Sequence, residues 1–156
     1  MGLDMYLTKV KREQVAYWRK ANAIHAWFDR KYQKISEGEP LENCQDFCVT
    51  RDDLIELKNT CEKVLESCKL TDKNVCVGEC FNHKTQEWDK IYAPSKVVED
   101  PSVAKELLPT REGCLFGTTD YTGSYVYDLK LTIAQIDKIL ETVDFDEYDI
   151  VYCAWW

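Results

Sequence analysis

Two segments of the chain carry apolar residues at the three- and four-residue spacing of a helix that buries one face. The first follows Thr50, where Asp53 three residues later acts in the manner of a capping box, and this helix is expected to reach about Ser67. The second segment predicts a helix over residues 124–142, whose apolar face holds Tyr125, Leu129, Ile133, Ile136 and Leu140. In addition to these two, a further helix is predicted over residues 12–33.

Strand-like sequence separates these helices. Short strands are predicted within residues 4–10, 44–50, 113–117 and 149–156. Residues 74–93 predict a β-hairpin with its loop near residues 82–85, and residues 100–109 predict a short helix with Asp100 as its cap and Pro101 at its first position. The alternation predicts an α/β (α+β) fold, in which two or three long helices cover a mixed sheet. We expect one domain over residues 1–156, with a hairpin inserted at about residues 70–98.

Charge and hydropathy exclude several classes of partner. The formal net charge of −8 argues against general nucleic-acid binding and against anionic membrane surfaces, because both reward a basic protein. No apolar run approaches the roughly 18–20 residues of a membrane-spanning helix. The opening MGLDMYLTKVKR lacks the build of a signal peptide, and Tyr6 stands where a myristoylation motif has Ser or Thr. A cytosolic protein with reduced thiols is therefore expected.

The cysteines and histidines form no established catalytic motif. Cys76 and Cys80 are spaced C-x-x-x-C with His83 nearby, whereas zinc knuckles use C-x-x-C turns. Alternation along a strand would place Cys76, Gly78 and Cys80 on one face, which is the simpler interpretation, and a metal at Cys76, Cys80 and His83 is left open. No nucleotide-binding loop or hydrolase motif is present. We expect no cofactor, no metal and no catalytic residue, although His25 could pair with a cysteine.

The segment VAYWRKANAIHAWFDRK, residues 15–31, holds more chemistry than a surface helix needs. Projected as a helix, one stripe of the segment is apolar and predicts core packing. The neighbouring row holds Trp18, Asn22, His25 and Asp29, with Arg19 within side-chain reach, and this mixture of groups is suited to a nucleotide-like ligand. An equally weighted alternative makes Trp18 a border residue of the core, His25 a hydrogen-bonded histidine and Arg19 the partner of a carboxylate. The candidate ligand-binding residues of this segment are Tyr17, Trp18, Arg19, Lys20, Asn22 and His25.

A second candidate lies in GCLFGTTDYTGSY, residues 113–125. A turn before a helix N-terminus offers free backbone N–H groups to an anion. Thr118, Thr119 and Tyr121 are the candidate residues there. The favoured alternative is an ordinary helix cap, in which Thr119 or Asp120 caps the helix that follows.

Several blocks of the sequence, in this order, carry a resemblance. They are GLDMYL at 2–7, VAYWRKANAIHAWF at 15–28, NC at 43–44, LLPTREGCLFGTTDY at 107–121 and the aromatic–small–Trp ending at 152–156. Together they resemble a widespread family of small bacteriophage and prophage proteins that begin GLDMYL. The resemblance implies a viral accessory role in the cytoplasm of a bacterial host, and it names no reaction. GCLFG departs from the more aromatic run expected there, and the hairpin resembles an insertion relative to shorter members.

These observations lead to three functional hypotheses. The first is a counter-defence sponge that sequesters a small phosphorylated or nucleotide-type immune signal. The second is an inhibitor that docks its acidic surface on a host protein, and the third is a nucleotide-processing enzyme with His25 as general base. A homo-oligomer with the ligand pocket at its interface would give the same sequence pattern.

Overall fold

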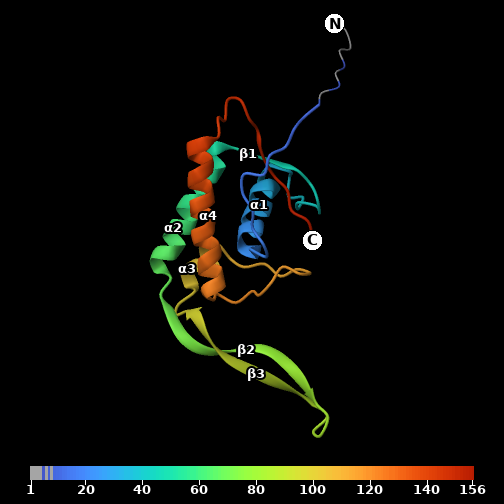
Figure 1. Cartoon of the computed structure of the whole chain (residues 1–156), viewed down its shortest axis with the longest axis vertical. Coiled ribbons are helices and arrows are strands. Elements are labelled where there is room, and N and C mark those ends of the chain that lie inside the picture. The colour runs from blue at the N-terminus through green and yellow to red at the C-terminus, as the bar shows by residue number, and fades with distance from the viewer. Residues whose placement is uncertain (1–4, 6, 8) are drawn as a thin grey trace.

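Helices form the body of the molecule and a long hairpin extends away from it (Figure 1). The computed structural model describes residues 5, 7 and 9–156. Within these residues, no helix is both long and apolar enough to cross a membrane. The elements of this part of the chain are α1 (Asn22–Ile35), β1 (Phe47–Val49), α2 (Arg51–Ser67), β2 (Leu70–Asn82), β3 (Glu87–Val98), α3 (Ser102–Leu107), α4 (Gly123–Thr142) and β4 (Ile150–Tyr152).

The predicted α+β class is confirmed, but the arrangement of the strands differs from the prediction. In the described residues the strands form two separate antiparallel pairs, β1 with β4 and β2 with β3, rather than one mixed sheet. Cys48 lies opposite Val151 at the centre of the β1–β4 pair, which joins the segment before α2 to the C-terminal segment. Each pair is too narrow to cover the helices, so the helices supply most of the core themselves.

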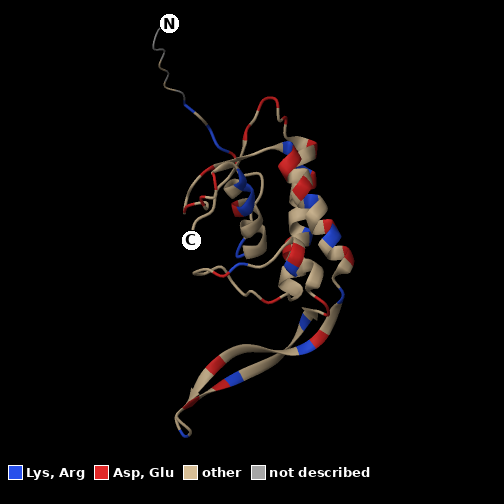
Figure 2. Cartoon of the chain, turned by 180° about the vertical axis from the view of Figure 1, so that it is seen from behind, with Lys and Arg blue, Asp and Glu red and all other residues tan. Residues whose placement is uncertain are grey.

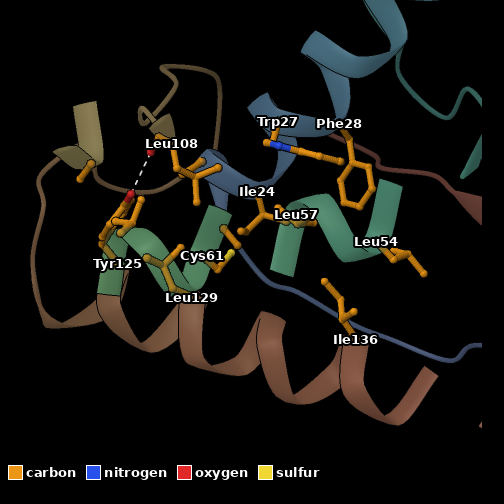
Figure 3. Packing of buried hydrophobic residues seen from close by; sticks show 14 of the residues in the cluster. Ile24, Trp27, Phe28, Leu54, Leu57, Cys61, Leu108, Tyr125, Leu129 and Ile136 are labelled. Carbon is orange, nitrogen blue, oxygen red and sulfur yellow. Dashed lines mark hydrogen bonds between the residues drawn. The ribbon is translucent and has the colours of Figure 1, made fainter. Parts of the chain in front are cut away.

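The core lies where α1, α2 and α4 meet (Figure 3). Leu57 on α2 and Leu129 on α4 are fully buried, and α2 and α4 lie side by side along much of their length (Figure 1). The Tyr125 hydroxyl donates a hydrogen bond of 2.9 Å to the Leu108 carbonyl, which ties α4 to the segment after α3. Burial raises the pKa of the Cys61 thiol to about 12, so this cysteine is a packing residue and not a nucleophile.

Local sequence signals correctly predict α2, α3, α4 and the hairpin. Thr50 is the N-cap of α2, and its side chain and that of Asp53 form a reciprocal capping box. The helix ends at Ser67 as expected. At α3 the predicted start is wrong by one residue: Pro101 is the N-cap and the helix begins at Ser102, whose backbone N–H donates to the Asp100 carboxylate.

The helix predicted over residues 12–33 begins ten residues late, at Asn22. Residues 12–20 instead form an irregular segment, which we call the N-terminal strap, and Lys20 ends it with a φ of 60°. Two hydrogen bonds to α4 hold the strap: the Tyr17 N–H donates to Gln135 Oε1 (2.6 Å), and Trp18 Nε1 donates to Thr132 Oγ1 (2.8 Å). These long-range bonds replace the helical bonds that the periodic pattern predicts.

The predicted strand over residues 113–117 is also wrong. Residues 113–117 form a turn in which the Phe116 N–H donates to the Gly113 carbonyl, and Leu115 adopts a φ of 62°. Leu115 is 73 % exposed, so this apolar run is not a buried strand. Of the strand predicted over residues 4–10, positions 4, 6 and 8 lie outside the described residues, and its other positions have no regular secondary structure.

The β2–β3 hairpin, which we call the arm, is mostly exposed and twists away from the helices (Figure 1). Cys76 pairs with Tyr92 and Gly78 pairs with Ile91, so Val77 is an extra residue that forms a β-bulge. Adjacent residues of β3 point to opposite faces, and the bulge therefore places Cys76 on the face opposite Cys80. The expectation that both cysteines share one face is wrong. In the described residues, no group of three His, Cys, Asp or Glu side chains could hold a metal.

Candidate functional site

An open groove of about 790 Å³ runs between the strap, the start of α1 and the C-terminal segment. Ligand sites are commonly concave pockets of this size, with apolar walls and a few directed polar groups. All six candidates of the strap and α1 line it: Tyr17, Trp18, Arg19, Lys20, Asn22 and His25. The rest of the wall includes two residues of the 113–117 turn and the C-terminal residues 150–156.

A smaller cavity of about 250 Å³, which we call the side cavity, adjoins the groove. Arg19 and Lys20 line both spaces, as does the start of α1. The remaining wall of the side cavity comes from the segment before α4 and from the first turns of that helix. Its hydrogen-bonding side chains from this region are Thr110, Thr118, Asp120, Ser124 and Asp128.

His25 is 8 % exposed and lies among aromatic rings at one wall of the groove. Its Nδ1 is 2.8 Å from the Tyr152 hydroxyl, and the rings of Phe116 and Trp156 lie 5.3 Å and 4.8 Å from the imidazole. Among the residues described, Nε2 has no hydrogen-bond partner. Burial, together with the positive charge of Arg111, lowers the pKa of His25, so the imidazole is neutral at physiological pH.

Asn22 is 6 % exposed, and hydrogen bonds within the protein occupy its side chain. Its Nδ2 donates to the carbonyls of Phe116 (3.1 Å) and Thr118 (2.8 Å), and its Oδ1 accepts from the Arg111 N–H (3.2 Å). Asn22 therefore fastens the loop of residues 108–122 to the start of α1. It shapes the wall shared by the groove and the side cavity, and it has one remaining lone pair to offer a ligand.

A second side chain that anchors the loop of residues 108–122 lies one helical turn beyond His25. Asp29 is 5 % exposed, and its carboxylate accepts hydrogen bonds from the Leu41 N–H (2.7 Å) and from Gln33 Nε2 (2.8 Å). Arg111 Nη1 forms an ion pair with the same carboxylate at 2.7 Å. The sequence projection placed Asp29 on the row of candidate residues, but its role in the structure is to anchor the loop that carries Arg111.

Arg19 and Lys20 are exposed at the border of the two spaces. Within the described part of the chain, neither side chain makes a hydrogen bond or an ion pair. The alternative in which Arg19 pairs with a carboxylate therefore has no support in this geometry. Two unpaired cations at the junction of two cavities can hold a phosphate or a carboxylate.

The candidates before α4 separate into two groups. Thr118 lines the side cavity, and its hydroxyl exchanges hydrogen bonds with Asp120. Thr119 and Tyr121 line neither space: the Thr119 carbonyl accepts from the Thr110 hydroxyl, and the Tyr121 hydroxyl accepts from the Thr110 N–H. These two residues hold the loop. The cap interpretation is wrong as well, because the N-cap of α4 is Thr122 and it makes no side-chain capping hydrogen bond.

Sequence reasoning missed Asp128, a half-buried carboxylate of the side cavity. Burial raises its pKa from 3.8 to about 6, and no ion pair with it exists among the described residues. Its only sequence signal is its position beside Leu129 at the edge of the apolar face of α4. Perturbed carboxylates in cavities are candidate functional groups, although structural causes also perturb them.

The raised pKa of Asp128 predicts a pH-dependent effect of Asp128→Asn on stability. Between about pH 4 and pH 6 the unfolded chain loses this proton while the native state keeps it, so wild-type stability falls as pH rises. Asp128→Asn has no carboxyl group at this position, so its stability does not fall with pH for this reason. At about pH 7.5 it is expected to be more stable by about 1 kcal/mol, after discounting the shift for the water that reaches this side chain. Urea unfolding across this pH range measures the difference, and a difference independent of pH contradicts the assignment.

Comparison with known proteins finds no family model that matches the chain, and no similar curated protein or solved structure. The resemblance to the phage family that begins GLDMYL stays a prediction.

Proposed function

We propose that the protein binds a small phosphorylated ligand of the nucleotide type in the groove and sequesters it. One observation carries this proposal: in a single groove, the rings of Trp18, Trp155 and Trp156 lie along the same walls as the cations Arg19 and Lys20, which have no partner in the described residues. Aromatic faces stack on a planar base, and the two cations bind phosphate.

Sequestration fits the site better than catalysis does. A general base must come within hydrogen-bond reach of the proton that it removes. The Nε2 of His25 is enclosed by neighbouring rings, and Nδ1 is already engaged with Tyr152. The resemblance to phage proteins supports the biological context that we propose, which is counter-defence in the cytoplasm of a bacterial host.

Thermal-shift measurement followed by release of the ligand tests the proposal. The protein is incubated with a panel of cyclic and ADP-ribose-type nucleotides, heated, and the released material is identified by chromatography. A true ligand at about 100 times its Kd is expected to stabilise the protein by about 2.7 kcal/mol, which raises Tm by roughly 5–10 °C. Recovery of intact ligand supports sequestration, and recovery of an altered ligand supports the enzyme. No shift with any nucleotide contradicts both.

The exposed arm favours one alternative function, inhibition of a host protein. Trp88 and Tyr92 are 64 % and 60 % exposed and lie on the same face of the hairpin. Large exposed aromatic side chains are common anchors of protein interfaces. Lys and Arg are interspersed with Asp and Glu along the helices and the arm (Figure 2), so the net charge of −8 is not gathered on one element. In this alternative, Trp88→Ala abolishes binding to the partner and leaves nucleotide binding unchanged.

A further inference from the structure

We propose that the ligand is a nucleoside diphosphate joined to a second sugar, with its base in the groove, its diphosphate on Arg19 and Lys20, and its second sugar in the side cavity. This inference rests on the proposed function and extends it to the class of ligand. It follows from the order in which the structure arranges aromatic, cationic and hydroxyl-binding groups.

The groove and the side cavity differ in chemistry. The groove is lined by aromatic rings from the strap, from α1 and from the C-terminal segment. The side cavity has one aromatic ring, that of Tyr125, whose hydroxyl already donates to the Leu108 carbonyl. Apart from Arg19, Lys20 and Asn22, which line both spaces, its hydrogen-bonding side chains are carboxylates and hydroxyls. A base is suited to the groove, and a group rich in hydroxyls is suited to the side cavity.

The position of the cations determines the order of the ligand's parts. Arg19 and Lys20 line both spaces, so a phosphate bound to them lies between the groove and the side cavity. In a mononucleotide the phosphate is at one end, and nothing would follow it into the side cavity. In a nucleoside diphosphate sugar, the diphosphate has the nucleoside on one side and a second sugar on the other. Of these two ligands, only the nucleoside diphosphate sugar fills both the groove and the side cavity.

Asp128 gives the side cavity its preference for a sugar. Vicinal hydroxyls of ribose donate well to a carboxylate, which is how dinucleotide-binding proteins recognise them. Asp128 is half-buried and free of any ion pair in the described residues, and Ser124 one turn earlier on α4 also lines the cavity. At about 250 Å³, the side cavity is smaller than a complete ligand pocket, so it accommodates a fragment and not a second nucleotide.

Titrations with ADP-ribose, ADP and AMP, monitored by tryptophan fluorescence, test the inference on the full chain. ADP-ribose is expected to bind at least about tenfold more tightly than ADP, because the added ribose donates hydrogen bonds to a carboxylate. Asp128→Asn is expected to bring the ratio of the two Kd values close to one. Asp137→Asn, on an exposed part of α4 outside both spaces, is the matched control and is expected to keep the wild-type ratio.

The outcomes separate this inference from the function on which it rests. If ADP and ADP-ribose bind equally well, the side cavity is not a sugar site, while nucleotide binding stands. The inference is likewise overturned if Asp128→Asn keeps the wild-type preference. If none of the three compounds binds, then the proposal for the groove fails as well.

Discussion

Asp29→Ala is expected to lower the free energy of unfolding by about 3–5 kcal/mol, the largest effect of any single substitution proposed for this protein. The carboxylate is buried and has three partners: Leu41, Gln33 and Arg111. Removing it leaves the Leu41 N–H without its acceptor and the Arg111 guanidinium without its counter-charge. For a chain of this length the loss lowers Tm by roughly 10 °C.

Chemical unfolding of wild type and variant measures this effect. Asp29→Asn keeps the shape and the hydrogen-bond acceptor and is expected to lose less. Asp137→Ala is the matched control, because that carboxylate is exposed and pairs with Lys58 at the surface; its loss is expected to cost less than about 1 kcal/mol. If Asp29→Ala and Asp137→Ala destabilise equally, the Asp29–Arg111 pair does not hold the loop.

The double variant Arg19→Ala/Lys20→Ala is expected to weaken nucleotide binding by at least about 100-fold. Each charge-assisted hydrogen bond to phosphate contributes about 1.5–3 kcal/mol, and every 1.4 kcal/mol is about a factor of ten in Kd. The unfolding temperature should stay at the wild-type value, because neither side chain makes a hydrogen bond or ion pair in the described part of the chain. Isothermal titration with the nucleotide selected from the panel gives the change in affinity.

Lys63→Ala/Lys130→Ala provides the matched control for this charge change. It removes two positive charges from the same total of −8, and both lysines are exposed, on α2 and α4, at positions outside the lining of the groove and the side cavity. Loss of binding in both double variants would show a general effect of net charge. Loss of fold in Arg19→Ala/Lys20→Ala would show that the strap needs these residues for its structure.

Local signals in the sequence were sufficient for the elements that depend on near neighbours. The capping box at Thr50 and the apolar period of α4 are both properties of a few adjacent turns, and both are confirmed. The strap was predicted as helix because its apolar spacing continues that of α1. Its real conformation depends on Gln135 and Thr132, which are more than a hundred residues away in the chain. No local pattern carries that information.

The candidate site was likewise predicted in part from the sequence. The sequence singled out the aromatic and cationic residues of the strap and α1, and all of them lie along one groove. The helical projection that grouped Trp18 with Asn22 and His25 was wrong in its geometry, because Trp18 precedes the helix. Asn22 is a residue type that often contacts ligands, yet its hydrogen bonds hold the loop of residues 108–122. Asp128 was missed because the side cavity that it lines also takes residues from the strap and from the start of α1, which are far from it in the sequence.

The arm leaves the body and returns to it at almost the same point. Leu70 pairs with Val98 at its base, and the Glu99 N–H donates to the Lys69 carbonyl at 2.8 Å. Closing a short connection across this point costs nearly the same entropy as closing the full hairpin. The length and composition of the arm can therefore change without moving the helical body that carries the groove.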